Sequence, residues 1–211
     1  MAAKNENEIA VSIPLEDVEK IQIYLNKSRK ALSAIIRETG AAYAINGTLY
    51  KMRNGKPVCP LKSNGVTLYH GCYTYRGYVW DNFNPESFHF DLVPNEAYSN
   101  YIACTHIVMD GQPVKKPVYN IAQGGKRGRT AIGTKIVNGQ RRICLYTSKD
   151  GTSARRTPEQ LAKLLSDYGW KDAVMLDGGG SSQAYFDHER RQVTSKRKVP
   201  HVILIYMKKG K

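Results

Sequence analysis

The chain of 211 residues lacks several features that would assign it to a class of protein at once. No apolar run approaches the roughly 20 residues that a membrane span requires. The N-terminal segment has scattered charges and none of the unbroken apolar stretch that is typical of a signal peptide. The sequence therefore predicts a cytoplasmic protein without a membrane span, and export by a route without the usual signal stays open.

Cysteine is scarce, and the four present are Cys59, Cys72, Cys104 and Cys144. They are widely spaced and form no Cys-x-x-Cys pair. This spacing argues against a zinc site and a disulfide framework, and it indicates buried thiols in a reducing compartment. The five histidines likewise show no metal-ligand spacing.

Acidic residues are few: 18 Asp and Glu stand against 32 Lys and Arg, for a net charge of +14. The basic residues gather at Lys126–Arg129, Arg141–Arg142, Arg155–Arg156 and Arg190–Arg197. One interpretation is a solvated surface that keeps the protein soluble. The other is a positive rim that steers an anionic substrate such as a cell-wall polymer, a nucleotide sugar or a nucleic acid. No helix-turn-helix, zinc-finger or RNP-like motif supports a nucleic-acid partner.

Hydrophobic residues make up 41% of the chain, which is enough for one substantial core. No internal repeat or low-complexity linker is present. We expect an N-terminal extension over residues 1–19 and a single domain over residues 20–211. The fold class we predict is α+β, a mixed strand-rich sheet with two main helices packed on it.

The two helices are predicted over Ser28–Gly40 and Thr157–Gly169, where apolar residues recur at helical spacing. The second has a complete start signal, with Thr157 as N-cap, Pro158 at the first position and Gln160 closing a capping box. Strands are predicted over residues 20–26, 41–47, 65–80, 87–93, 100–114, 173–177 and 199–207. Residues 129–148 form a predicted hairpin with its turn at Asn138-Gly139.

The most informative stretch is "VMLDGGGSSQAYF", residues 174–186. An apolar strand ends in Asp177, passes three glycines and two serines, and becomes apolar again. Glycine loses more backbone freedom on folding than any other residue, so three in a row are costly and need a reason. A strand end that delivers side chains to a cleft would give one. The plainer interpretations are a turn aspartate at Asp177 and serines that cap a short helix.

Two further motifs join this one, "GAAYAINGTLY" (residues 40–50) and "GRTAIGT" (residues 128–134). With the helix and strand before Asp177 (residues 157–185), they occur in the order found in the phosphodiester glycosidase family, which the sequence resembles over about residues 28–206. The chain differs from the family pattern at Thr48, Leu49 and Tyr50, where a second glycine and an aromatic residue are usual. It also has "VTSKRKVPHVILIY" where an Asn-Arg-Pro-type segment commonly precedes the last strand.

The resemblance implies a hydrolase that cleaves the glycosidic bond of a sugar-1-phosphodiester, with a substrate like a GlcNAc-1-phosphodiester. Asp177 would be the general base on water or would stabilise an oxocarbenium-like transition state. Arg129 would hold the phosphate with two parallel hydrogen bonds. The expected substrate-binding residues are Asn46, Gly47, Thr130, Gly178, Gly179, Gly180, Ser181 and Ser182. No cofactor is expected, although Asp177 could help to hold a divalent cation near the phosphate.

Each of these residues also has an ordinary structural interpretation. Arg129 could pair with a surface carboxylate, and Asn46-Gly47 is a common turn dipeptide. Tyr69, Tyr73, Tyr75, Tyr78 and Trp80 are most simply strand aromatics, with sugar stacking as the alternative. The rival function is a non-catalytic module that captures a phosphorylated glycan, a nucleotide or a nucleic acid through its basic surface.

Overall fold

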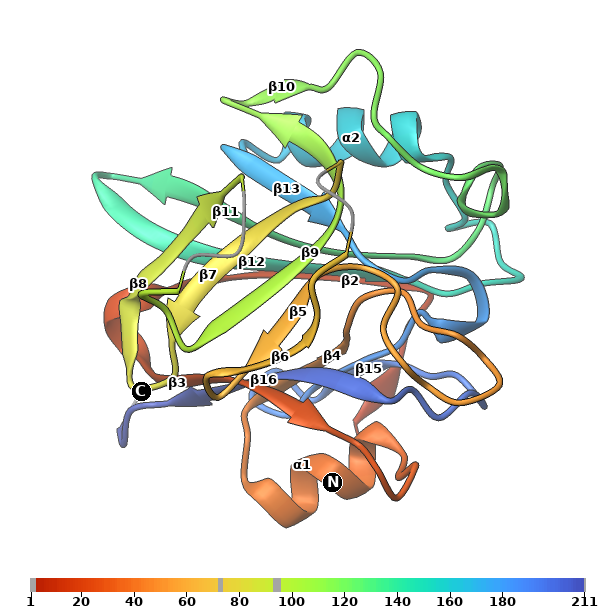
Figure 1. Ribbon diagram of the computed structural model, residues 1–211. Coiled ribbons are helices and arrows are strands. Elements are labelled where there is room, and N and C mark those ends of the chain that lie inside the picture. The colour runs from red at the N-terminus through yellow and green to blue at the C-terminus, as the bar shows by residue number, and fades with distance from the viewer. Residues whose placement is uncertain (1–2, 72–73, 93–95, 211) are drawn as a thin grey trace.

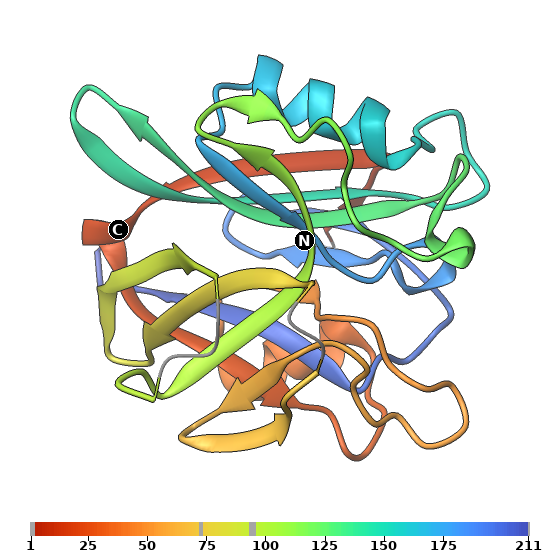
Figure 2. The same cartoon turned by 45° about the horizontal axis from the view of Figure 1, so that its top comes forward.

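The computed structural model describes residues 3–71, 74–92 and 96–210, and these form two stacked β-sheets with a helix on the outer face of each (Figures 1 and 2). Cys72 and Tyr73 lie outside the described residues. In the part of the chain that is described, no helix is both long and apolar enough to cross a bilayer. The cytoplasmic location stays a prediction.

The first sheet has six strands in the order β1-β15-β14-β4-β16-β3. Their bounds are β1 Lys4–Asn5, β15 Arg191–Val193, β14 Ala184–Phe186, β4 Tyr43–Asn46, β16 His201–Met207 and β3 Val18–Leu25. The pairings are antiparallel except that of β1 with β15. The sheet therefore combines strands from both ends of the chain.

The second sheet has ten strands, and its main path is β2-β12-β11-β13-β9-β5-β6. The bounds along this path are β2 Glu8–Pro14, β12 Gln140–Ser148, β11 Arg129–Val137, β13 Asp172–Met175, β9 Asn100–Met109, β5 Leu61–Ser63 and β6 Val66–Tyr69. Beside the path, β9 also pairs with β10 (Gln112–Pro113) and with β7 (Arg76–Asp81), which in turn pairs with β8 (Asn84–Asp91). The long strand β9 changes partners midway: Asn100–Cys104 pairs with β7, and Thr105–Val108 pairs with β13.

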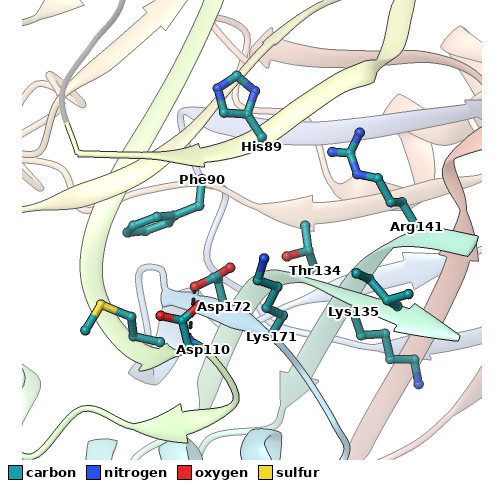
Figure 3. A pocket seen from close by; sticks show the side chains of 10 residues that line it. His89, Phe90, Asp110, Thr134, Lys135, Arg141, Lys171 and Asp172 are labelled. Atoms are coloured by element: carbon teal, nitrogen blue, oxygen red, sulfur yellow. Dashed lines mark hydrogen bonds between the residues drawn. The ribbon is translucent and has the colours of Figure 1, made fainter. Parts of the chain in front are cut away.

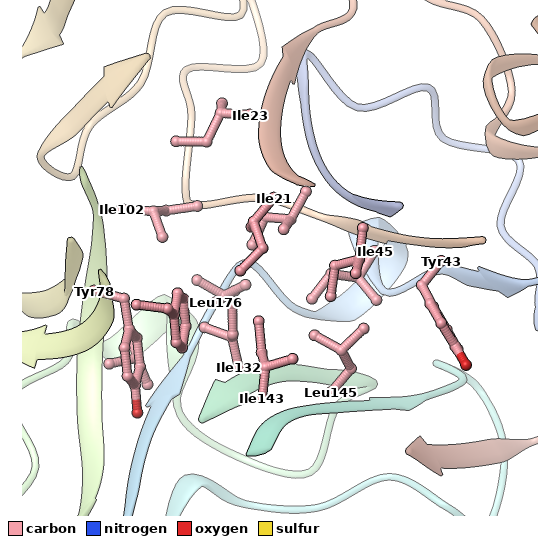
Figure 4. Close-up of a cluster of buried hydrophobic side chains, with 14 of the residues drawn as sticks. Ile21, Ile23, Tyr43, Ile45, Tyr78, Ile102, Ile132, Ile143, Leu145 and Leu176 are labelled. Carbon is pink, nitrogen blue, oxygen red and sulfur yellow. The ribbon is translucent and has the colours of Figure 1, made fainter. Parts of the chain in front are cut away.

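The main core lies between the two sheets and follows from strict alternation along the strands. On β12, Ile143 and Leu145 point into this core, whereas Cys144 and Tyr146 point to the outer face. Strands of the six-stranded sheet alternate in the same way. Figure 4 shows the inward-pointing set, in which Ile132, Ile143, Leu145 and Leu176 face Ile21 and Ile45 of the other sheet.

The outer faces are covered by α1 (Leu32–Thr39) and α2 (Pro158–Asp167), which lie on opposite sides of the molecule in Figure 1. α1 packs on β4 and β14, and α2 packs on β9, β10 and β13. The predicted α+β class with two main helices is thus confirmed, and the single predicted sheet is in fact two. Three short 3-10 helices complete the structure: η1 (Leu15–Asp17), η2 (Ile121–Gln123) and η3 (Gly179–Ser181).

The local predictions hold where a capping or turn signal is complete. Thr157 caps α2, its hydroxyl accepting from the Gln160 N–H while the Gln160 side chain accepts from the Thr157 N–H. Asn138 and Gly139 both have positive φ, as a two-residue hairpin turn requires, and they join β11 to β12.

α1 begins at Leu32 and not at Ser28. The Asn26 side chain bonds both the N–H and the carbonyl of Lys30, and Arg29 has a φ of 53°, so residues 26–30 form a loop. No side chain caps the helix at Ala31. The serine that suggested an earlier start therefore does not cap this helix.

The N-terminal extension expected over residues 1–19 is not separate from the domain. β2 pairs along its whole length with β12, and Ile9 and Ile13 are buried in the main core. Ile9, Val11, Ile13 and Leu15 alternate along this segment, and this period of two was the available signal for the strand. β2 is an edge strand of the larger sheet.

Candidate active site

A cavity of about 310 Å³ opens at the end of β13, where the triglycine loop begins. It collects residues from segments far apart in the sequence. Its lining consists of Leu49, Tyr50, Val58, Asn120, Ala122, Gln123, Arg127, Arg129, Met175, Leu176, Asp177, Gly178, Gly179, Gly180 and Arg197. We call it the Asp177 cavity.

Asp177 is the only carboxylate among these lining residues within the described part of the chain. Burial raises its pKa from 3.8 to about 6, against the opposing effects of a hydrogen bond from Ser181, the charge of Arg197 and the Gly178 N–H. The Gly178 N–H donates to Oδ1 at 3.0 Å, and Arg197 Nη1 donates to the Ser181 hydroxyl at 3.0 Å. The carboxylate is thus fixed in place and its pKa lies near neutrality, which suits a general base.

The loop after Asp177 needs its glycines for separate reasons. A Cβ on Gly178 would lie 2.8 Å from the Gly128 carbonyl oxygen, and Gly179 has a φ of 59°, which side-chain-bearing residues rarely adopt. A Cβ on Gly180 would meet the Arg197 guanidinium at 3.1 Å. Glycine here lets the loop approach β11 closely and leaves room for an arginine at the cavity wall.

Asn46 lies at the end of β4 and is fully buried. Its Nδ2 donates to the backbone carbonyls of Asp177 (2.8 Å) and Gly47 (3.3 Å), and its Oδ1 accepts from the Thr130 hydroxyl (2.6 Å) and the Gln183 N–H (3.1 Å). These four bonds use the whole capacity of the amide. The geometry therefore favours a positioning role over the predicted direct contact with substrate.

Gly47 and Thr130 belong to the same support. The Asp177 N–H donates to the Gly47 carbonyl at 3.2 Å, so the backbone of Asp177 is held on both sides. Thr130 is buried and does not line the cavity. The motifs around Asn46, Thr130 and Asp177 meet through this one amide, and it joins the two sheets.

Replacing Asn46 by alanine is expected to lower the free energy of unfolding by about 3–4 kcal/mol, because all four hydrogen-bond partners of the amide lose their bonds at once. Thr130→Val removes only one of those bonds and is expected to cost about 1 kcal/mol. Urea denaturation of both variants measures the difference. Equal, small losses would show that Asn46 does not hold the sheets together.

Arg129, predicted to hold phosphate, has its side chain turned into the protein, with 1% of its surface exposed. Its guanidinium donates to the carbonyls of Arg156 (2.7 Å), Gln123 (2.8 Å) and Gly125 (2.6 Å). Burial, helped by the nearby Arg127, lowers its pKa to about 10, so it stays charged at neutral pH. It borders the Asp177 cavity while holding the loop around η2, and a phosphate contact stays a prediction.

Three site features were not predicted from the sequence. Arg197 stands in the segment that departs from the family pattern, and it lies against Asp177 and Ser181. Leu49 and Tyr50, the other departure, line the cavity wall. The two departures from the family pattern were the available signal for these residues. Among the predicted aromatics, Tyr78 and Trp80 are buried in the core.

The basic clusters do not all gather at this site. Arg127, Arg129 and Arg197 line the Asp177 cavity, whereas Arg141 lines another cavity of about 400 Å³ at the opposite end of β11 and β13. Figure 3 shows this second cavity, with Asp110 and Asp172 beside Lys171. Arg142 is held by Ser12. The predicted rim would thus have to form from the 126–129, 155–156 and 190–197 clusters, since the backbones of Arg127 and Arg156 hydrogen-bond to each other.

A divalent cation does not fit the residues at Asp177. Within the described residues no group of three or more His, Cys, Asp and Glu side chains could hold a metal ion. The positive charge of Arg197 acts on the Asp177 carboxylate and would repel a cation there. We therefore derive no step through a metal.

The fold and the site together define an α+β protein with one half-buried carboxylate at a strand end, in a cavity that arginines also line. The chain belongs to the phosphodiester glycosidase family, whose sequence profile matches residues 39–206. Two strands precede this match: β2 belongs to the ten-stranded sheet and β3 to the six-stranded sheet. No curated protein matches the chain.

Solved structures share the fold at low sequence identity. The catalytic domain of zebrafish N-acetylglucosamine-1-phosphodiester alpha-N-acetylglucosaminidase, auto-inhibited by its pro-peptide, is 15% identical, with a TM-score of 0.67 over 99% of this chain and 87% of that one. A hypothetical protein from Synechocystis is 12% identical, with a TM-score of 0.74 over 95% and 59%. A putative exported protein from Burkholderia pseudomallei is 12% identical, with a TM-score of 0.63 over 94% and 73%.

Proposed function

We propose that this protein hydrolyses the glycosidic bond of a sugar-1-phosphodiester at the Asp177 cavity. The observation that carries the proposal is a single carboxylate in a cavity that arginines also line. Most glycosidases need two carboxyl groups, because an alcohol must be protonated as it leaves. A phosphate monoester is a weak base and leaves without an acid, so one carboxylate suffices.

The reaction follows from this geometry. The oxygen of a water molecule attacks the anomeric carbon while the bond from that carbon to the phosphate oxygen breaks. The electron pair of that bond leaves with the phosphate, and Asp177 takes the proton of the water. Arg197 would stabilise the charge on the departing phosphate, whereas the Gly178 and Gly179 N–H groups already donate to Asp177 and Gly128. Leu49, Tyr50 and Val58 give the apolar wall on which a sugar ring can pack.

The test is to incubate the protein with a GlcNAc-1-phosphodiester and with UDP-GlcNAc and to measure free sugar. Release of sugar with loss of activity in Asp177→Asn supports the proposal. Tight binding of sugar phosphates without turnover on any member of a panel would instead identify the non-catalytic binding module, and it would end the catalytic assignment.

The pH dependence gives a separate prediction. The carboxylate must be ionised to accept a proton, and its pKa is raised to about 6. We expect kcat/KM to rise about tenfold per pH unit up to about pH 6 and then to level off. A phosphodiester does not titrate in this range, so the change reports the enzyme. A profile that is flat from pH 4 to pH 8 would remove Asp177 as the base.

A further inference from the structure

A third cavity, also of about 400 Å³ and separate from the one in Figure 3, lies next to the Asp177 cavity. It shares Gly179 and Gly180 with the Asp177 cavity as lining residues. Its other lining residues are Lys149, Asp150, Ser182, Thr194, Ser195 and Lys196. We call it the Lys149 cavity. The glycine loop thus forms a common wall between two hollows of similar size.

The two cavities differ in chemistry. The Asp177 cavity has apolar side chains from Leu49, Tyr50 and Val58, whereas the Lys149 cavity is lined by two ammonium groups, three hydroxyls, one carboxylate and backbone. Neither Lys149 nor Lys196 forms an ion pair with any residue that the structure describes. Asp150 Oδ1 accepts from the Gly128 N–H at 2.8 Å, and its negative charge leaves the lining with an excess of one positive charge.

Ser182 is the strongest sign that the Lys149 cavity is built for a ligand. It is 2% exposed, and its hydroxyl has no hydrogen-bond partner among the described residues. A buried hydroxyl without a partner lowers stability, so such groups in native proteins need an explanation. A ligand oxygen in the cavity that Ser182 lines would supply the missing partner.

We propose that the Lys149 cavity is the subsite for the leaving half of the substrate, and that this half carries a second phosphate group. The inference rests on the proposed function. The scissile phosphate would lie over the shared wall at Gly179 and Gly180, with the sugar on the Asp177 side. Lys149 and Lys196 bind the second phosphate as free cations, and the Ser182 hydroxyl hydrogen-bonds to one of its oxygens or to a hydroxyl group near it.

The test compares two substrates that share the sugar and the scissile phosphate. UDP-GlcNAc has a second phosphate on the leaving half, and the methyl phosphodiester of GlcNAc has none. Lys149→Ala/Lys196→Ala is expected to lower kcat/KM at least tenfold for UDP-GlcNAc and less than twofold for the methyl diester. The matched control is Lys135→Ala/Lys171→Ala, which removes the same charge from the cavity at the far end of β11 and should change neither value more than twofold. Equal losses on both substrates, or no loss on either, would overturn the subsite.

A second measurement separates the subsite from the proposed function. If the wild-type protein cleaves neither substrate, the function fails, and calorimetry with UMP and with glycerol 3-phosphate then tests the subsite alone. Binding that is lost in Lys149→Ala/Lys196→Ala supports it, and the tighter of the two ligands shows whether the leaving half is a nucleotide or a phosphorylated polyol. Ser182→Ala should weaken the same binding while leaving the melting temperature unchanged or raised. No binding of either ligand, or binding unaffected by these changes, would overturn it.

Discussion

Replacing Asp177 by asparagine is expected to reduce turnover at least 1,000-fold, roughly the loss expected when a catalytic base is removed, and to make the protein more stable above pH 6. An amide of the same shape keeps the acceptor for the Gly178 N–H but cannot take a proton from water. These two opposite effects would show that the protein keeps the Asp177 carboxylate for catalysis although it lowers the free energy of unfolding.

The sign of the stability effect follows from the pKa. The folded protein raises the pKa of Asp177 from 3.8 to about 6, because burial disfavours the charged form. Below about pH 4 the carboxyl is protonated in both the folded and the unfolded protein, and it costs no stability through its charge. As the pH rises from about 4 to about 6, the unfolded protein ionises first, so the free energy of unfolding falls. Asparagine never ionises and avoids this loss, which amounts to about 1–3 kcal/mol for a partly exposed group.

Denaturation of wild type and Asp177→Asn at pH 4 and pH 7.5, beside turnover at pH 7.5, measures both effects. The stability gain should be present at pH 7.5 and nearly absent at pH 4. Asp187→Asn is the matched control, since Asp187 is exposed on the same segment and should change neither quantity. An Asp177→Asn variant with full activity would end the catalytic assignment.

Replacing Arg129 by lysine is expected to lower both stability and activity severely, although the charge is kept. The guanidinium reaches three carbonyls in different directions, at Gln123, Gly125 and Arg156. One ammonium nitrogen cannot span them, so buried acceptors are left without donors at a cost of about 2–4 kcal/mol. The loop that carries Gln123 also lines the Asp177 cavity, so its displacement should lower kcat/KM about 100-fold or more.

Stability and activity together distinguish the two roles of Arg129. Loss of both indicates an arginine that holds the loop in place, whereas loss of kcat/KM with normal stability indicates one that grips phosphate. Arg155→Lys, an exposed arginine nearby, is the control and should leave both values unchanged. Normal values of both in Arg129→Lys would exclude either role.

The sequence by itself determined the features that depend on short-range contacts. The capping box of α2 and the Asn138-Gly139 turn involve residues at most three positions apart, so their geometry can be read from residue type. The three motifs also placed Asp177 at a strand end, because the apolar run and the glycines after it are contiguous. The family and the α+β class followed from the same segments.

The tertiary structure alone decided how those segments meet. The bonds of Asn46 to Asp177 and Gln183 join residues more than 130 positions apart, and no local pattern distinguishes an amide that supports a backbone from one that binds a sugar. The sequence suggested that Arg129 binds phosphate, because it could not show that the guanidinium donates to the carbonyl of Arg156, 27 positions away. The Lys149 cavity gathers residues from the loops after β12, β13 and β15, and charge and exposure there depend on packing that only the folded chain defines.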